Sequence, residues 1–257
     1  MRALWCIGAC GLLIGIGVVA AQQCMTGIRA KRLTVITDSQ QRAKEIRAEQ
    51  AEIVIDSIRL KAKRIVKLRL FNGRDLSGWK AYLADPNAKM EDVWRVENGI
   101  LICKGTPLGY LYTEKDYKNY ILRLEWRWAP GKQPGNSGVL LRVHGEHKIW
   151  PRSVEAQLMY MNAGDFWLID GAPLETDPAF VDKNAPRHRI RKKNAEKPAP
   201  EWNQYEIIVY NDRIILRVNG ETVNEGTGAE VVAGKIALQS EGGEIHFRNI
   251  ELIVLED

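Results

Sequence analysis

Cysteine is scarce in the body of this sequence. Cys6, Cys10 and Cys24 lie in or just after an apolar N-terminal stretch, which leaves Cys103 alone in the remaining chain. No Cys-x-x-Cys pair occurs, and the four histidines do not keep the spacing of metal ligands, so no metal site is predicted. A divalent metal held by carboxylates and a distant histidine is left open, and no cofactor is predicted. We expect Cys103 to be a small buried apolar side chain.

The sequence also lacks a Gly-rich phosphate loop and any regular alternation of strands with helices, which points away from an α/β fold. Its formal charge of +5 is unevenly placed. Residues 1–70 hold 13 Lys and Arg against 5 Asp and Glu, whereas residues 71–257 hold 24 against 27. The body is therefore slightly acidic, and no basic groove for nucleic acid is predicted.

Charged residues are absent between Arg2 and Arg29. This span is strongly apolar and reaches small residues before a polar break, which is the pattern of a signal peptide over residues 1–21 with cleavage after Ala21. The alternative is an uncleaved membrane anchor, because Ala3–Ile28 is long enough to span a bilayer. The basic residues at 29–32 would favour a cytoplasmic position for the segment after them. On balance the leader predicts an exported domain, either periplasmic, secreted or attached to the membrane.

Residues 22–68 form a charged stretch with few helix breakers between Asp38 and Lys63. A helix cap at Asp38 or Ser39 predicts a helical linker, whose last residues become the first strand of the next domain. An amphipathic helix on a membrane surface is the alternative for this segment.

From residue 69 to residue 257, short segments of period two recur between Gly, Asn, Asp and Pro residues. In YILRLEWRW, leucine and tryptophan alternate with arginine and glutamate. Hairpin turns are predicted at Asn98-Gly99, Asn211-Asp212 and Asn219-Gly220. The polar interval 162–201 predicts long loops over one face or edge. Together these features indicate an all-β, antiparallel β-sandwich domain.

Five motifs follow one another along this domain: LFNGRDLSGW, GNSGVLLRV, WPRSVEAQLMYMNAGDFWLI, EWNQYEIIVYNDRIILRVNGETVNE and GKIALQSEGGEIHFRNIEL. Together they resemble the 3-keto-disaccharide hydrolase domain family over about Leu70 to Leu255. The resemblance implies a jelly-roll fold of the concanavalin A-like lectin/glucanase kind. It also implies a secreted hydrolase and a carbohydrate substrate, namely a glycoside whose sugar carries a ketone at C3.

A ketone at C3 acidifies the neighbouring C2–H, so cleavage can proceed through proton abstraction, an enolate and loss of the C1 substituent. Such a reaction needs a base near C2, a positive group near O3 and an acid for the leaving oxygen. An ordinary glycosidase would instead place two carboxylates around the anomeric carbon. A noncatalytic carbohydrate-binding domain is the other alternative, and it predicts a flat Trp-lined surface rather than a pocket.

The segment SVEAQL supplies the first candidate site residues. Its period of two puts Glu155 and Gln157 on one face and apolar residues on the other. Arg142 in SGVLLRV would approach Glu155 if the two strands are neighbours, either as a structural ion pair or as a catalytic partner. We predict that Glu155 is the general base and that Arg142 stabilises the enolate.

Glu125 stands between two arginines on the polar face of its strand. It is predicted as a second catalytic carboxylate, with a solvated charged face as the alternative. Trp167 follows the strand of Glu155, where a loop can place its ring over a sugar. The residues predicted to bind substrate are Gln157, Asn136, Ser137, Asp165, Trp167, Gln239 and Glu241.

Overall fold

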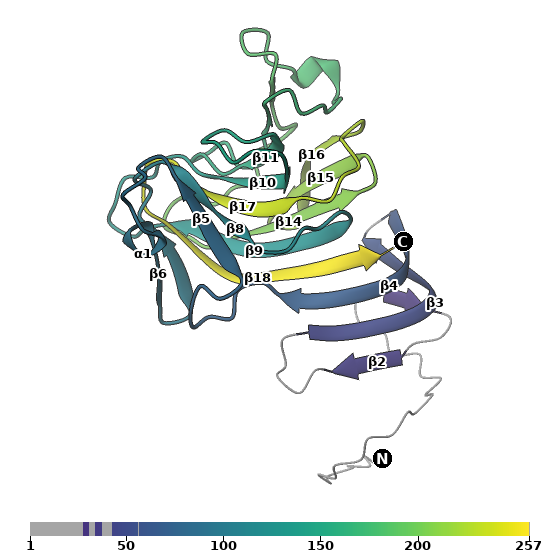
Figure 1. Cartoon of the computed structure of the whole chain (residues 1–257). Helices are drawn as coiled ribbons and strands as arrows, with labels where there is room; N and C mark the ends of the chain where they lie inside the picture. The colour runs from purple at the N-terminus through teal and green to yellow at the C-terminus, as the bar shows by residue number, and fades with distance from the viewer. Residues whose placement is uncertain (1–27, 31–33, 38–42, 56, 257) are drawn as a thin grey trace, which may run out of the picture.

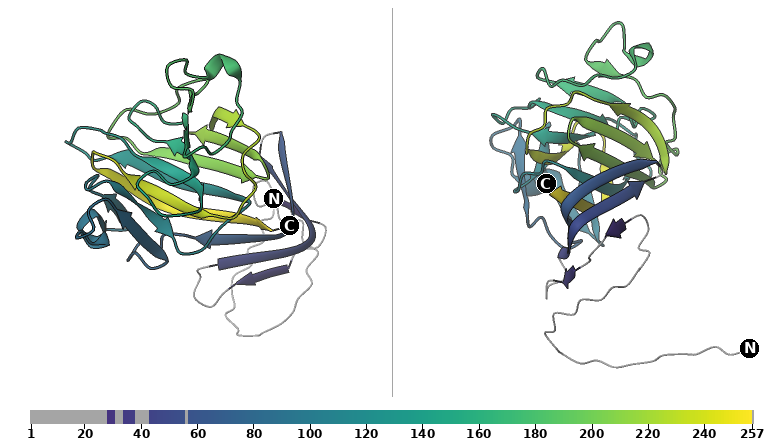
Figure 2. Two further views of the ribbon diagram at one scale, coloured as in Figure 1. Left: turned by 45° about the horizontal axis from the view of Figure 1, so that its top comes forward. Right: turned by 90° about the vertical axis from the view of Figure 1, so that its right-hand side faces the viewer.

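The computed structural model describes residues 28–30, 34–37, 43–55 and 57–256, and their side chains from residue 52 onward. The predicted leader of residues 1–21 lies outside these ranges and stays a prediction. Within them, no helix is long and apolar enough to cross a membrane. Figures 1 and 2 show two packed sheets, one of which is extended by strands from the N-terminal part of the chain.

In the described ranges, antiparallel pairing builds an eleven-stranded sheet and a seven-stranded sheet. The eleven-stranded sheet contains β1 (Ile28–Ala30), β2 (Thr34–Thr37), β3 (Ala43–Ile55), β4 (Ile58–Arg69), β6 (Trp94–Glu97), β7 (Ile100–Cys103), β9 (Tyr120–Trp128), β14 (Asn203–Tyr210), β15 (Arg213–Val218), β16 (Glu221–Gly226) and β18 (Ile245–Glu256). The seven-stranded sheet contains β5 (Trp79–Leu83), β8 (Gly109–Thr113), β10 (Gly138–Val143), β11 (Ser153–Gln157), β12 (Phe166–Ile169), β13 (His188–Arg189) and β17 (Lys235–Ser240). The short helices are α1 (Met90–Val93) and the 3-10 turn η1 (Pro178–Phe180).

The core lies between the two sheets and follows from the period-two pattern. In β9, Leu122, Leu124, Trp126 and Trp128 are at most 2% exposed and belong to this core, while the charged residues between them face outward. Burying one large apolar side chain stabilises a fold by about 1.5–3 kcal/mol, so this alternation fixes which face of each strand points inward. Cys103 is also fully buried in the core, as predicted. The all-β jelly-roll sandwich predicted from the sequence is confirmed.

The hairpin turns explain how neighbouring strands stay in register. Asn98 and Gly99, between β6 and β7, have φ angles of 51° and 77°, and Asn219 and Gly220, between β15 and β16, have 50° and 84°. Two successive residues with positive φ match the right-handed twist of the flanking strands, and Asn-Gly adopts this conformation at low cost. The turns predicted at Asn98-Gly99 and Asn219-Gly220 are confirmed.

The N-terminal extension differs from the helix predicted for residues 22–68. Its described residues form strands instead, and β3 and β4 make a long hairpin that joins the eleven-stranded sheet through the pairing of β4 with β18. The reason is an alternation that the helix prediction overlooked: Leu60 and Ala62 are buried while Arg59, Lys61 and Lys63 are exposed. Period two places all apolar side chains of a strand on one face, which a helix would scatter around its axis. The helix prediction is therefore wrong.

The connection from β12 to β14 carries little regular structure. Among residues 170–202 the described elements are β13 and η1 alone. The connection is tied to the edge of the seven-stranded sheet because β13 pairs with β12, and it stands beyond that edge in Figure 1. Long loops over one edge, as predicted, bring distant residues to the outer face of this sheet.

Candidate active site

The outer face of the seven-stranded sheet is where the predicted polar residues gather. In β11, Val154 and Ala156 belong to the core, so Glu155 and Gln157 must point to the opposite face. Across this face Glu155 is paired with Leu140 of β10 on one side and with Trp167 of β12 on the other. A cavity of about 330 Å³ opens here, lined by Asn136, Trp150, Glu155, Gln157, Met159, Trp167, Leu168, Ile169, Arg187 and Glu241.

Glu155 lies at the buried end of this cavity, with 4% of its surface exposed. Burial raises the pKa of its carboxyl well above the usual value, and the negative charge of Glu241 raises it further. The Gln239 side chain and the positive Arg187 act in the opposite direction on this pKa. No described residue forms a hydrogen bond with Glu155 Oε1. A buried carboxyl oxygen without a partner is costly when the carboxyl is charged, which agrees with the raised pKa of Glu155.

Glu241 is the second carboxyl of the cavity. Burial raises its pKa to about 7, and a hydrogen bond with the Asn136 side chain opposes that rise. The backbones of Asn136 and Glu241 also form an antiparallel bridge, which fixes the two side chains next to each other. The negative charge of Glu241 in turn raises the pKa of Glu155, so the titrations of the two carboxyls are coupled.

Gly138 makes room for this arrangement. A Cβ atom on Gly138 would lie 2.2 Å from Glu155 Oε1 and 2.5 Å from Gln239 Oε1, much closer than non-bonded atoms can approach. Glu155 and Gln239 therefore sit directly over the bare backbone at the start of β10. The predicted substrate residue Gln239 is 2% exposed and does not line the cavity.

One wall of the cavity is aromatic and positively charged. The ring of Trp167 stacks on that of His188, with centroids 4.4 Å apart and an interplanar angle of 6°. The guanidinium of Arg187 lies 5.3 Å from the centre of the Trp167 ring. The backbone carbonyl of Arg187 accepts a hydrogen bond from the Leu168 N–H at 2.8 Å, which ties its loop to β12. Trp167 is thus a flat, fixed surface beside the two carboxyls.

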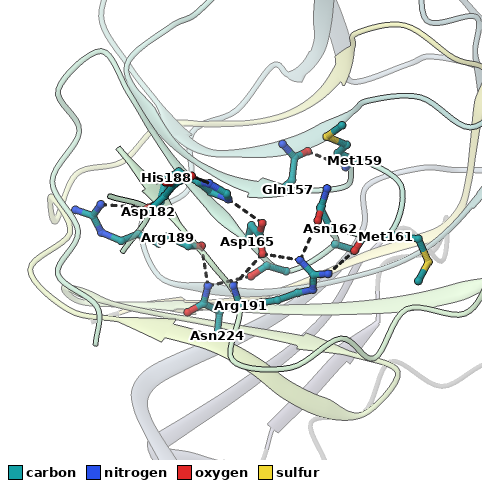
Figure 3. Close-up of polar contacts among 12 residues, drawn as sticks. Gln157, Met159, Met161, Asn162, Asp165, Asp182, His188, Arg189, Arg191 and Asn224 are labelled. Carbon is teal, nitrogen blue, oxygen red and sulfur yellow. Dashed lines mark hydrogen bonds and ion pairs between the residues drawn. The ribbon is translucent and has the colours of Figure 1, made fainter. Parts of the chain in front are cut away.

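Asp165 holds this wall in place from behind. His188 Nε2 lies 2.8 Å from Asp165 Oδ2, and His188 Nδ1 lies 3.1 Å from Asp182 Oδ2 (Figure 3). Hydrogen bonding to Asp165 foremost, and also to Asp182, raises the pKa of His188 above its usual value. Asp165 also accepts hydrogen bonds from the backbone and side-chain nitrogens of Arg191, each at 2.9 Å. Asp165 therefore positions the loop and does not line the cavity where it was predicted to bind substrate.

Gln157 lines the cavity as predicted, but its carbonyl oxygen is already in use. It accepts hydrogen bonds of 2.8 Å from the backbone N–H groups of Leu158 and Met159. This leaves the amide nitrogen as the end of Gln157 available to a ligand.

The predicted approach of Arg142 to Glu155 is wrong. The pairing of β10 with β17 shifts between Leu140 and Val143, and Arg142 has a φ of 50° at this irregular point, so its side chain leaves the face that Leu140 shares with Glu155. Its guanidinium donates to the backbone carbonyls of Lys118 and Glu230 and to Asn119 Oδ1. Arg142 is a structural residue that binds loops together.

Glu125 and Ser137 also lie elsewhere than predicted. Glu125 belongs to the eleven-stranded sheet, where its carboxylate accepts hydrogen bonds from Arg248 at 2.6 Å and Asn249 at 3.0 Å. The solvated-face alternative for Glu125 matches this position, and a catalytic pair of Glu125 with Glu155 is excluded because the two belong to different sheets. Ser137 is fully buried and donates to the backbone carbonyl of Gln239 at 3.0 Å.

Five cavity residues were missed by the sequence reasoning: Trp150, Met159, Leu168, Ile169 and Arg187. Arg187 belongs to the basic stretch RHRIRKK in the polar interval 162–201, while Trp150 and Met159 flank the strand of Glu155 on either side. Trp150 opens the motif WPRSVEAQL, so its closeness to Glu155 was a usable signal. Among the described residues, no cluster of three or more His, Cys, Asp and Glu side chains could hold a metal ion.

With this geometry in view, the comparison with known proteins decides the family. The profile of the 3-keto-alpha-glucoside-1,2-lyase-like domain family matches residues 68–253. The chain belongs to this family. The match covers the sandwich from the end of β4 into β18, and so includes both carboxyls of the cavity.

Two known proteins are similar to this chain along most of its length. A curated 3-keto-disaccharide hydrolase of Bacteroides thetaiotaomicron is 23% identical over 96% of this chain and 97% of its own length. A crystal structure from Parabacteroides distasonis, described as that of a candidate glycosyl hydrolase, superposes with a TM-score of 0.55. It is 20% identical and covers 74% of this chain and 94% of its own. This likeness confirms the concanavalin A-like fold of the family.

Proposed function

We propose that this protein is a glycoside-cleaving enzyme that acts on 3-keto-glycosides by elimination across C1 and C2. The observation that carries the proposal is the pair of carboxyls with raised pKa, Glu155 and Glu241, in one cavity with the positive Arg187. Groups with strongly shifted pKa values in a pocket are typical of acid–base chemistry. The family description, a 1,2-lyase acting on 3-keto-glucosides, names the same bond positions.

The reaction requires a base, an acid and a positive group, and the two carboxyls and Arg187 of the cavity suit these roles. A base removes the proton from C2, and the electron pair of that C–H bond moves to form an enolate whose negative charge rests on O3. The enolate then expels the C1 substituent, whose oxygen takes a proton from an acid. Addition of water to the resulting double bond at C1 completes a net hydrolysis. Arg187 is the positive group that would stabilise the charge at O3.

The electrostatics of the pair suggest how the acid and base roles are divided. Glu155 is more deeply buried than Glu241, and the negative charge of Glu241 raises the pKa of Glu155 further. Glu155 is therefore the carboxyl that holds a proton in the free site. In this proposal Glu241 is the base toward C2 and Glu155 is the acid toward the leaving oxygen. The sequence alone had suggested Glu155 as the base.

The division of roles is tested with substrates that differ in their leaving group. A 4-nitrophenyl 3-keto-glucoside needs little help from an acid, whereas a methyl 3-keto-glucoside needs a great deal. If Glu155 is the acid, Glu155→Gln should lose far more activity on the methyl than on the 4-nitrophenyl compound. A base is needed for both, so equal losses on the two substrates would assign Glu155 as the base instead.

The function itself is tested by incubating the purified protein with a 3-keto-glucoside and with its unoxidised parent. Release of the leaving group from the keto compound alone supports the proposal, because only the ketone acidifies C2. Release from both compounds would indicate an ordinary two-carboxylate glycosidase, now with Glu155 and Glu241 as the pair. Binding without release from either would indicate a carbohydrate-binding domain. Glu125→Gln, on the other sheet, is the matched control for the loss of a carboxylate.

A further inference from the structure

The mouth of the cavity differs in chemistry from its buried end. Trp150 and Met159 line the cavity, yet they are 43% and 45% exposed, among the most exposed large apolar side chains of the described structure. Exposing a tryptophan to water costs free energy that burial would recover, and apolar surface gathered at the rim of a pocket is typical of a binding surface. Neither residue has a role in the acid–base chemistry proposed above.

We propose that Trp150 and Met159 form a subsite for the leaving group of the substrate. The inference rests on the proposed function, which places the reacting C1 and C2 atoms beside the buried Glu155. The C1 substituent must then project outward, past the mouth. What it meets there is an indole ring, which stacks on a flat apolar face, and a flexible thioether, which adapts to varied shapes. The subsite thus accepts a leaving group with a flat apolar face, either an aromatic ring or the C–H face of a sugar.

Trp150 is held in place by the loop that carries it. On one side of Trp150, the Lys148 ammonium lies 2.7 Å from Asp170. On the other side, Arg152 binds the carboxylate of Glu230 at 2.7 and 3.0 Å. Both contacts connect the loop to neighbouring segments of the domain. A loop backbone that is ordered before binding loses little entropy when a ligand stacks on the side chain that it carries, which strengthens binding.

A third anchor of this loop is His147. Its ring lies over a group of tyrosines on the outer face of β5 and β8: the centroid distances are 4.5 Å to Tyr112 and 5.7 Å to Tyr82. His147 Nδ1 is 2.8 Å from the hydroxyl of Tyr110. Tyr110 pairs with Gln239 in the adjacent strand, so the anchor and the carboxyl site share one sheet face. His147 is therefore a positioning residue for Trp150.

The experiment measures kcat/KM of Trp150→Ala on three 3-keto-glucosides, whose leaving groups are methyl, phenyl and glucosyl. Loss of the stacking surface should lower kcat/KM about tenfold on a leaving group that reaches it, and less than about twofold on methyl. A selective loss on phenyl, on glucosyl or on both supports the subsite and identifies which source it accepts. An equal loss on all three, or no loss on any, overturns it.

Matched controls separate this effect from general damage to the fold. Trp202→Ala removes another partly exposed tryptophan, one that stacks with Arg248 on the eleven-stranded sheet, and should leave the three-substrate pattern unchanged. Met159→Ala removes the other side chain of the subsite and should also give a selective loss. Met161→Ala is its control, because Met161 is exposed but does not line the cavity. His147→Ala should reproduce the Trp150→Ala pattern in weaker form. If His147→Ala instead lowers all three rates equally, its role as a positioning residue is refuted.

A binding measurement keeps this inference separate from the proposed function. If the protein cleaves no 3-keto-glucoside, the proposed function fails, but the subsite can still be tested by calorimetric titration with phenyl and methyl glucosides. The subsite predicts tighter binding of the phenyl compound, and loss of that preference in Trp150→Ala. Equal affinity of the native protein for the two compounds would refute the subsite.

Discussion

The outer faces of the two sheets carry similar residue types but use them in opposite ways. On the eleven-stranded sheet, a cavity of about 480 Å³ is lined by charged residues that already have partners: Glu125 binds Arg248, and Glu206 binds Arg123 at 2.7 Å and also Arg217. On the seven-stranded sheet, the smaller cavity holds two carboxyls with raised pKa, and Glu155 Oε1 lacks any partner among the described residues. The two cavities differ in whether their carboxyls already have ion-pair partners, and the larger cavity is not the one that holds the carboxyls with raised pKa.

The largest expected effect comes from exchanging one carboxyl on each face. Glu155→Gln should lower kcat on a methyl 3-keto-glucoside about a hundredfold or more, because it removes an acid–base group. Its melting temperature should stay the same or rise, since a neutral amide replaces a carboxyl that burial disfavours in its charged form. Glu125→Gln should keep full activity and lose at most about 1 kcal/mol of stability, the usual worth of an exposed ion pair. Steady-state kinetics and thermal unfolding of both variants measure these two effects. Normal activity of Glu155→Gln would exclude this residue from the mechanism.

The arginines permit a similar test. Arg187→Met should lower kcat on the order of a hundredfold, because the enolate loses its positive partner, while the melting temperature changes little for an exposed loop residue. Arg142→Met should do the reverse. It removes the donor of hydrogen bonds to Lys118 O, Glu230 O and Asn119 Oδ1, and should lower the stability by about 1–3 kcal/mol in all. Measuring rate and stability side by side checks both, and a rate loss at Arg142 without destabilisation would restore its predicted role.

Gly138→Ala tests the close packing under the two buried side chains. The added methyl would occupy the space of Glu155 Oε1 and Gln239 Oε1, so one of them must move. We expect a loss of roughly 1–3 kcal/mol in unfolding free energy, as for other overpacked sites, and about a tenfold fall in kcat. Gly220→Ala, a turn glycine of the eleven-stranded sheet with open space around it, shows how much stability loss backbone strain alone produces. Equal rate losses in the two variants would contradict a specific effect at Glu155.

The smallest effect concerns stability against pH. The folded pKa of Glu241 is about 7, above the usual value of 4.5, and that of Glu155 is raised as well. As pH rises from about 4.5 to 7, the unfolded chain loses these protons while the folded chain keeps them, so unfolding becomes easier. The two groups should therefore make the folded protein less stable at the upper end of this window than at its lower end. Comparing melting temperatures of the native protein and the Glu155→Gln, Glu241→Gln double variant at pH 5 and pH 7.5 isolates this contribution. A native curve that falls no more steeply than that of the double variant would refute it.

The sequence predicted those parts of the molecule that depend on local alternation. The strands, the Asn-Gly turns and the placement of Glu155 and Gln157 on one face all follow from period two. What failed depends on how strands are assembled: Glu125 is on a polar face as expected, but of the other sheet. Arg142 would have pointed beside Glu155 in a regular strand, and a register shift turned it away.

Two further failures have other physical causes. The N-terminal segment contains good helix formers, and its alternation became decisive only because the sheet edge at β18 offers a partner for β4. Arg187 reaches the cavity from a long loop, whose course is set by the contacts of Asp165 with His188 and Arg191 rather than by any local pattern. Residue proximity of this kind is a property of the folded chain.

The place of β18 in the eleven-stranded sheet has a consequence for how the chain folds. β18 comes last among the described strands, yet it pairs with β4, β7 and β9 and so lies in the interior of the sheet. Ile253, for example, pairs with Ile121, far away along the chain. Pairings between such distant segments are slow to form because a long loop must close first. The sandwich can therefore be completed only after residues 245–256 have been synthesised. Until then the edges of β4 and β9 that pair with β18 are unpaired and accessible to a chaperone.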